Sequence, residues 1–264
     1  MVQVASDGTR ITYDDLGRGE PTLLFMPGWC GNRSVFKDVV LRSSTHRHTL
    51  VLDWRGHGES GPPSGDFGVE GLLEDAMAVI NAGGARQVVP VALAHAGWVA
   101  IELRRRLGKR MPKLVLLDWI VTEPSEPFRA ALEGMQSPER WRETVERIST
   151  SWIHGVINAK LHRFVRKEVG SYRFEMWARA AREISAAYAK AGSPLELLSK
   201  LEPPLPVLHL YAQPDDPGYL AAQRAFAAAH PWFTVSKLAA QSHFPMFEVP
   251  DEMAGAIERF VRAA

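Results

Sequence analysis

The sequence is poor in cysteine, with Cys30 the single example in 264 residues. One cysteine excludes an internal disulfide framework and is typical of a protein kept in a reducing compartment. A signal-peptide core is also missing from the polar first ten residues, and no run approaches the roughly 18 apolar residues that span a membrane. We therefore expect a cytoplasmic protein with no membrane partner.

An excess of one charge is also absent, because 31 basic residues are balanced by 30 acidic ones. Without a basic patch or a long run of like charges, the sequence shows no footprint for nucleic acid or an anionic membrane. Hydrophobic residues make up 46% of the chain, enough to bury a substantial core. At this length, one large domain with an insertion is commoner than two domains. The composition favours a small neutral or aromatic ligand and does not predict an oligomeric state.

Motifs for metals and nucleotides are missing as well. His46 and His48 form a weak pair without a carboxylate at a plausible spacing, and there is no cysteine cluster or His-Glu-x-x-His sequence. No Gly-x-Gly-x-x-Gly follows the first strand, and no phosphate-binding loop is present. We therefore expect no bound metal, nucleotide or flavin.

What the sequence does contain is an alternation of apolar strands and amphipathic helices. Residues 2–15 alternate around a central Asp-Gly pair in the pattern of a hairpin. Strands are predicted at 22–26, 49–53, 87–93, 113–117, 207–211 and 233–238, and helices at 71–82, 98–107, 219–229 and 251–263. This order is typical of an α/β protein with a mostly parallel sheet and helices on both faces. Only helical spacing continues through residues 123–192, so we expect a helical cap inserted into a core of residues 1–122 and 193–264.

Residues 90–98 read Pro-Val-Ala-Leu-Ala-His-Ala-Gly-Trp, an apolar strand that runs through a tight turn into a helix. Ala92 and Ala96 are small residues on either side of Ala94, as the sharp turn of a nucleophile elbow requires. The pattern predicts an α/β-hydrolase fold whose nucleophile is missing, because a methyl group at position 94 cannot attack a carbonyl. Chemistry must then come from another residue or from the substrate.

His243 follows the last predicted strand, where an imidazole can reach the strand ends and act as a base near neutral pH. Alone, such a histidine is more often a surface residue, but chain order and the elbow favour a functional role. A base of this kind needs a carboxylate to hold its tautomer. Asp118, at an apolar strand end, is favoured because an unpaired carboxylate there would be costly. Asp215 and Asp216, in a solvated turn after a later strand, are the alternative.

Two peptides occupy the places from which such a fold supplies oxyanion donors, Gly28–Trp29 and Ala94–His95. Trp29 and His95 are therefore the predicted N–H donors. The simpler alternative is that Gly28 only permits a turn and that His95 only caps a helix.

Aromatic residues of the predicted cap are candidates for the wall of a substrate pocket that also includes Ala94. Trp152, Trp177 and Tyr188 have flat rings that can sandwich a planar ligand. Each of them alone is more often part of a core.

Taken together, these residues resemble the cofactor-independent dioxygenases that open 3-hydroxy-4(1H)-quinolone rings on an α/β-hydrolase fold. The resemblance covers nearly the whole chain. Its most specific pieces are Pro27-Gly28-Trp29-Cys30, Asp53-Trp54-Arg55-Gly56-His57, His95 with Gly97-Trp98, Asp118-Trp119, Glu175-Met176-Trp177, Arg182-Glu183-Ile184, Gly192-Ser193-Pro194-Leu195 and His243-Phe244-Pro245.

The resemblance implies that His243, supported by Asp118, removes the proton of the substrate's 3-hydroxyl group. The anionic ring would then reduce O2 without a metal or cofactor, and a cyclic peroxide would break down to carbon monoxide and an N-acylanthranilate. The peptides of Trp29 and His95 would stabilise the negative charge on the ring oxygen. The expected partners are thus an aromatic heterocycle and O2.

Family members that act on unsubstituted or 2-methyl quinolones commonly carry serine at the position of Ala94. A larger or differently seated substrate would explain the departure, as would an engineered substitution. Similarity to the branch that acts on 2-alkyl-3-hydroxy-4(1H)-quinolones, which are bacterial signals, favours the first explanation and a role in signal degradation. Two rival interpretations are an esterase or lactonase that has lost its serine, and a binding protein without turnover.

Overall fold

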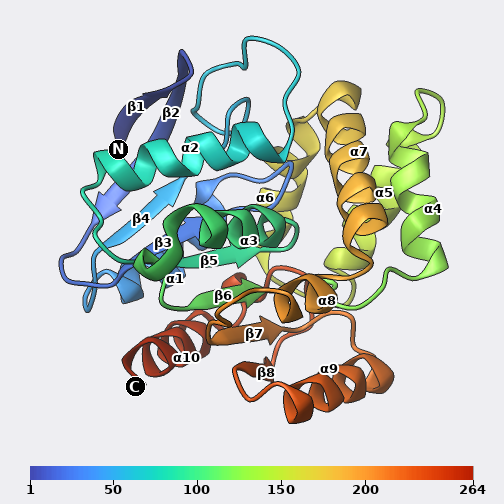
Figure 1. Ribbon diagram of the computed structural model, residues 1–264. Coiled ribbons are helices and arrows are strands. Elements are labelled where there is room, and N and C mark those ends of the chain that lie inside the picture. The colour runs from blue at the N-terminus through green and yellow to red at the C-terminus, as the bar shows by residue number, and fades with distance from the viewer. Residues whose placement is uncertain (264) are drawn as a thin grey trace.

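Eight strands form one sheet in the order β1-β2-β4-β3-β5-β6-β7-β8 (Figure 1). The computed structural model describes residues 1–263, so position 264 of the predicted core lies outside the described residues. The strands are β1 (Val2–Ser6), β2 (Thr9–Leu16), β3 (Thr22–Met26), β4 (Thr49–Leu52), β5 (Val88–Leu93), β6 (Leu114–Leu117), β7 (Val207–Tyr211) and β8 (Phe233–Lys237). β2 pairs antiparallel with both β1 and β4, and the other neighbours pair parallel. The predicted hairpin and mostly parallel sheet are confirmed.

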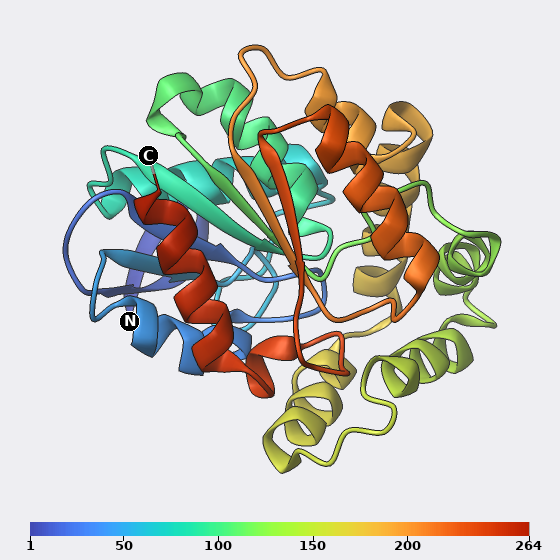
Figure 2. The same cartoon turned by 90° about the horizontal axis from the view of Figure 1, so that it is seen from below.

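The central strands are buried along their whole length because helices cover both faces of the sheet. Every residue of β3, β5, β6 and β7 is buried. One face carries α2 (Val69–Ala82) and α3 (Ala96–Leu107), and the opposite face carries α1 (Lys37–Ser43) and α10 (Pro250–Arg262) (Figures 1 and 2). Another core helix, α9 (Pro217–Ala229), packs beside β8. This is the predicted α/β-hydrolase architecture.

The chain between β6 and β7 is helical, and its longer helices lie beyond the carboxyl ends of the strands (Figure 1). Its helices are α4 (Glu126–Gln136), α5 (Trp141–Trp152), α6 (Ala159–Lys167), α7 (Phe174–Ala191) and α8 (Pro194–Ser199). α7 packs against α4 and α5, so the insertion has internal contacts of its own. The helices α4 to α7 thus stand over the edge of the sheet at which parallel α/β proteins bind ligands.

Candidate active site

Three non-glycine residues in left-handed backbone conformation lie at the carboxyl ends of neighbouring strands. Cys30 follows β3 with φ 58°, Ala94 follows β5 with φ 49°, and Asp118 follows β6 with φ 42°. A positive φ strains an L-residue by about 1–3 kcal/mol, and such strain clusters at functional sites. β5 lies between β3 and β6 in the sheet, so the three residues mark one edge as the candidate site.

His243 and Asp118 meet at this edge. The Nδ1 atom of His243 lies 2.8 Å from Oδ1 of Asp118, whose side chain is fully buried. The other oxygen, Oδ2, accepts hydrogen bonds from the backbone N–H groups of Ala212 at 2.7 Å and Gln213 at 3.2 Å. Burial raises the pKa of Asp118, while the bond to His243 and the two amides act in the opposite direction. A carboxylate held in this way makes Nδ1 of the imidazole the protonated nitrogen and leaves Nε2 with its lone pair.

The helical insertion holds the same imidazole from its other side. The backbone N–H of His243 donates to the carbonyl of Trp152 at 2.9 Å, and the two side-chain rings stack with centroids 5.0 Å apart. His243 is therefore fixed between the sheet domain and the insertion.

A cavity of about 660 Å³ opens beside the histidine, within the range of pockets for small organic ligands. Most of its wall is apolar. Of the predicted site residues, those that line it are Trp29, Ala94, His95, Asp118, Trp152, Trp177 and His243.

Tyr188 does not line the cavity, contrary to the expectation. Its hydroxyl donates to the carbonyl of Ile120 at 2.6 Å, and its ring packs against Trp98 and His95. Tyr188 therefore lies behind His95 and supports it instead of contacting a ligand.

The alternative carboxylates do not reach His243 either. Asp215 forms an ion pair with Lys237, and Asp216 caps α9 by accepting from the backbone N–H groups of Gly218 and Tyr219. Both carboxylates lie at the surface, as expected for residues in a solvated turn.

The two predicted oxyanion donors are available. Within residues 1–263 the backbone N–H groups of Trp29 and His95 have no protein acceptor, whereas the N–H of Ala94 donates to Leu117. Both residues line the cavity, so their amides remain free to meet a negatively charged ligand atom.

His57 holds the loop that carries Trp29. Its Nε2 accepts from the backbone N–H of Cys30 at 3.1 Å, and its Nδ1 donates to the carbonyl of Arg55. Burial lowers the pKa of His57 to about 4, so the ring stays neutral and keeps its acceptor. Holding this loop is therefore a structural task of His57.

We expect acid to destabilise the fold through three neutral histidines, of which His57 and His209 are buried and His95 is half-buried at the cavity wall. Burial is the main cause that lowers the pKa of His57 to about 4, of His95 to about 3 and of His209 to about 4. As pH falls below the ordinary value near 6.5, the unfolded chain binds protons first, so the free energy of unfolding falls towards pH 4 by roughly 1–3 kcal/mol per histidine. Urea unfolding over this pH range measures the slope. The free energy of unfolding of His57→Gln should depend less steeply on pH than that of the parent, whereas the exposed control His46→Gln should keep the parent's slope. Equal slopes for the two variants would contradict the assignment.

Several further wall residues were missed from the sequence. They are Trp119, Phe128, Met135, Phe164, Ile184 and Phe244. Phe244 and Trp119 could have been found from the sequence, because each directly follows a predicted catalytic residue, His243 or Asp118. The others come from helices whose packing angle no sequence spacing reveals.

Among residues 1–263, no helix combines the length and the apolar character needed to cross a membrane. In the same described part of the chain, histidine, cysteine and carboxylate side chains nowhere gather in threes in a way that could hold a metal ion.

Comparison with known proteins places the chain among proteins of this architecture. Residues 23–256 match the model of the alpha/beta hydrolase family. A 2-heptyl-3-hydroxy-4(1H)-quinolone dioxygenase of Mycobacteroides abscessus is 36% identical over 94% of this chain and 93% of its own length. The 1H-3-hydroxy-4-oxoquinoline 2,4-dioxygenase of Pseudomonas putida is 34% identical, and the match covers both chains completely.

Solved structures agree with these matches. The structure of AqDC, described as the basis for recognition and ring-cleavage of the Pseudomonas quinolone signal, superimposes with a TM-score of 0.94 at 34% identity over both full chains. A 1H-3-hydroxy-4-oxoquinoline 2,4-dioxygenase gives a TM-score of 0.95 at 34% identity, over 99% of this chain and all of the other. An enol-lactonase of Burkholderia xenovorans, at 19% identity and a TM-score of 0.78, shares the fold alone.

Proposed function

The chain belongs to the α/β-hydrolase family and, within it, to the 3-hydroxy-4-quinolone 2,4-dioxygenases, and from this premise we propose that it cleaves 2-alkyl-3-hydroxy-4(1H)-quinolones with O2. One observation carries the proposal: the His243–Asp118 pair lines an apolar cavity in which the elbow presents the methyl group of Ala94 and no nucleophile. This equipment suits proton removal from a bound ring and does not suit acyl transfer.

In the proposed reaction His243 takes the proton of the substrate's 3-hydroxyl group on its free Nε2. Asp118 stabilises the imidazolium that results, as the carboxylate of a catalytic triad does. The negative charge spreads over the ring oxygens, and the amides of Trp29 and His95 stabilise it. The apolar wall strengthens each of these interactions because it excludes water.

The deprotonated ring then supplies the electrons that O2 needs, so the proposed reaction uses no resident metal or organic cofactor. Dioxygen becomes bonded to ring carbon 2 as a peroxide, and the peroxide attacks carbon 4. Breakage of the cyclic peroxide leaves one oxygen atom in the acyl group and one in the carboxylate. Carbon 3 leaves with its own oxygen as carbon monoxide, and the product is an N-acylanthranilate.

We propose further that residues 123–192 act as the cap over this cavity, with Trp152 and Trp177 in its wall. The quinolone signals named for the relatives would then be removed by this enzyme. Cys30 is a free, buried thiol, which suits the reducing cytoplasm that we propose as its location.

The test is a direct product assay. We expect the purified, chelator-treated protein to consume one O2 and release one carbon monoxide for each 2-heptyl-3-hydroxy-4(1H)-quinolone, with an N-acylanthranilate as product. An oxygen electrode, a carbon monoxide trap and mass spectrometry give the three readings. Loss of the quinolone without carbon monoxide would contradict the ring-cleavage route.

A hydrolase that has lost its serine is the main rival, and Ala94→Ser separates the two functions. If the cavity serves ring oxidation, we expect ester hydrolysis by this variant to remain at the level of the parent. The reason is that a cavity shaped for a flat ring does not position an ester carbonyl against position 94 and the two oxyanion amides. Restored esterase activity of several orders of magnitude, measured with a panel of aryl and alkyl esters, would favour the rival.

A further inference from the structure

Two histidines face the same cavity, and their ring nitrogens are held in opposite ways. Nδ1 of His243 is bonded to a carboxylate oxygen of Asp118, which can only accept, at 2.8 Å. Nδ1 of His95 lies 3.2 Å from the indole Nε1 of Trp119, which can only donate. The two partners are consecutive residues at the end of β6.

These bonds determine where each ring carries its hydrogen. An accepting partner requires hydrogen on Nδ1 of His243, which leaves Nε2 as a base. A donating partner requires a lone pair on Nδ1 of His95, which places the hydrogen on Nε2. Within residues 1–263 no protein group accepts from Nε2 of His95, and the ring lines the cavity.

We propose that Trp119 is a positioning residue that makes His95 a neutral N–H donor to the bound ligand, while Asp118 makes His243 the base. The inference rests on the proposed function, because the acceptor is an oxygen of the quinolone. It adds a side-chain donor to the backbone N–H of the same residue, so that His95 contacts the developing negative charge twice.

Three features support the assignment. Burial, and to a smaller extent the charge of His243, lower the pKa of His95 to about 3, so this ring does not compete for the substrate's proton. Phe128 stacks on its face at 5.7 Å and limits rotation. The indole is itself fixed, because a Cβ atom on Gly97 would lie 2.2 Å from the Trp119 ring, a contact that only glycine permits.

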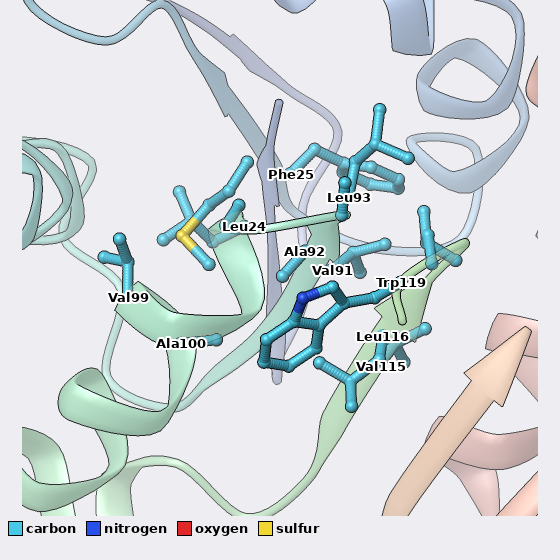
Figure 3. Close-up of a cluster of buried hydrophobic side chains, with 14 of the residues drawn as sticks. Leu24, Phe25, Val91, Ala92, Leu93, Val99, Ala100, Val115, Leu116 and Trp119 are labelled. Atoms are coloured by element: carbon cyan, nitrogen blue, oxygen red, sulfur yellow. The ribbon is translucent and has the colours of Figure 1, made fainter. Parts of the chain in front are cut away.

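Figure 3 shows the indole of Trp119 beside the elbow helix, among Val91, Ala92, Ala100 and Leu116. Its ring is almost fully buried. Trp119 thus lies in the apolar core and directs its one polar hydrogen, on Nε1, towards His95. The same packing explains why the chain resembles its family both at Gly97 and at Asp118-Trp119.

The first test needs no turnover. NMR of the ligand-free protein with isotopically labelled histidine nitrogens distinguishes a ring nitrogen that carries hydrogen from one that does not, and His95→Leu identifies the signals. We expect Nε2 of His95 to be protonated in the parent, and the two nitrogens to move towards averaged positions in Trp119→Phe. A protonated Nδ1 in the parent overturns the proposal.

Two matched control variants show whether the His95 tautomer depends on Trp119 specifically. Trp98 packs edge-on against Trp119 at 4.9 Å, and its indole nitrogen is buried without a partner. Trp98→Phe therefore removes an indole N–H from the same cluster and leaves the signals of His95 unchanged. Burial raises the pKa of the Tyr188 hydroxyl, and an interaction with the Trp119 side chain partly opposes this rise, so the hydroxyl is a rival acceptor for the same indole N–H. Tyr188→Phe removes this rival acceptor; a changed tautomer in either control contradicts the assignment.

A double-mutant cycle gives the kinetic test. We expect Trp119→Phe to lower kcat/KM about 3- to 10-fold, the size of one neutral hydrogen bond, and His95→Leu to lower it about 10- to 100-fold. The double variant should equal His95→Leu alone, because the indole acts through the imidazole. Fully additive losses overturn the proposal. If the fixed tautomer is observed but no quinolone is consumed, the proposed function fails and the tautomer assignment stands.

Discussion

The His243→Ala variant is expected to turn over quinolone roughly 100- to 10,000-fold more slowly than the parent, the range for loss of a general base. The imidazole is the cavity residue with a carboxylate partner on one nitrogen and a free lone pair on the other. Ligand binding survives, because the apolar wall and the backbone amides of Trp29 and His95 do not depend on this side chain. Single-turnover kinetics and equilibrium binding of the substrate without O2 separate the two effects.

An exposed histidine of the insertion provides the control. His154→Ala removes an imidazole from the loop after α5 and should leave turnover unchanged. Deprotonation of the bound substrate, followed by its absorbance without O2, should fail in His243→Ala alone. Parental turnover in that variant would remove His243 from the mechanism.

The fold was predictable because its signals are local. Each buried strand, such as β3, β5 or β6, and the turn after it can be recognised from a short stretch of sequence. Parallel pairing then brings the carboxyl ends of these strands to one edge. Desolvation cost alone was enough to single out Asp118 from the solvated carboxylates, and the structure places Asp118 against His243.

Tyr188 shows what the sequence could not supply. It lies eleven residues after Trp177, which is three turns of α7, so both residues lie on one helix face. Their spacing in the sequence therefore predicts the same position in the pocket wall for both. Along the axis, however, they are about 16 Å apart. Trp177 reaches the cavity, whereas Tyr188 meets the core helix α3 through Trp98. How far the cavity extends along α7 depends on tertiary packing, which residue spacing does not encode.

Side-chain direction is the second limit. The sequence indicated the peptide of His95 as a donor, yet the indole that orients its ring belongs to Trp119, which follows a different strand, β6. Only the register of β5 and β6, which pairs Leu93 with Leu117, brings the next residues of both strands together.

Asp118→Asn is expected to lower turnover roughly 1,000- to 10,000-fold, more than Asp118→Ala, although asparagine is closer in shape. The amides of Ala212 and Gln213 both donate to Oδ2, so the oxygen of asparagine must remain there and its NH2 group must face His243. That NH2 group donates to Nδ1, moves the hydrogen of the imidazole to Nε2 and removes the lone pair that takes the substrate's proton. Alanine leaves the tautomer free and so retains part of the activity.

Kinetics of both variants, with histidine nitrogen NMR, test this order. Asp216→Asn is the matched control, because its side-chain oxygen can still cap α9 and its turnover should equal that of the parent. Equal losses in Asp118→Asn and Asp118→Ala would mean that the carboxylate acts by charge alone. Full activity in both would return the role to Asp215 or Asp216. With Asp118→Asn, both histidines of the cavity would carry hydrogen on Nε2, so the site would hold two donors and no base.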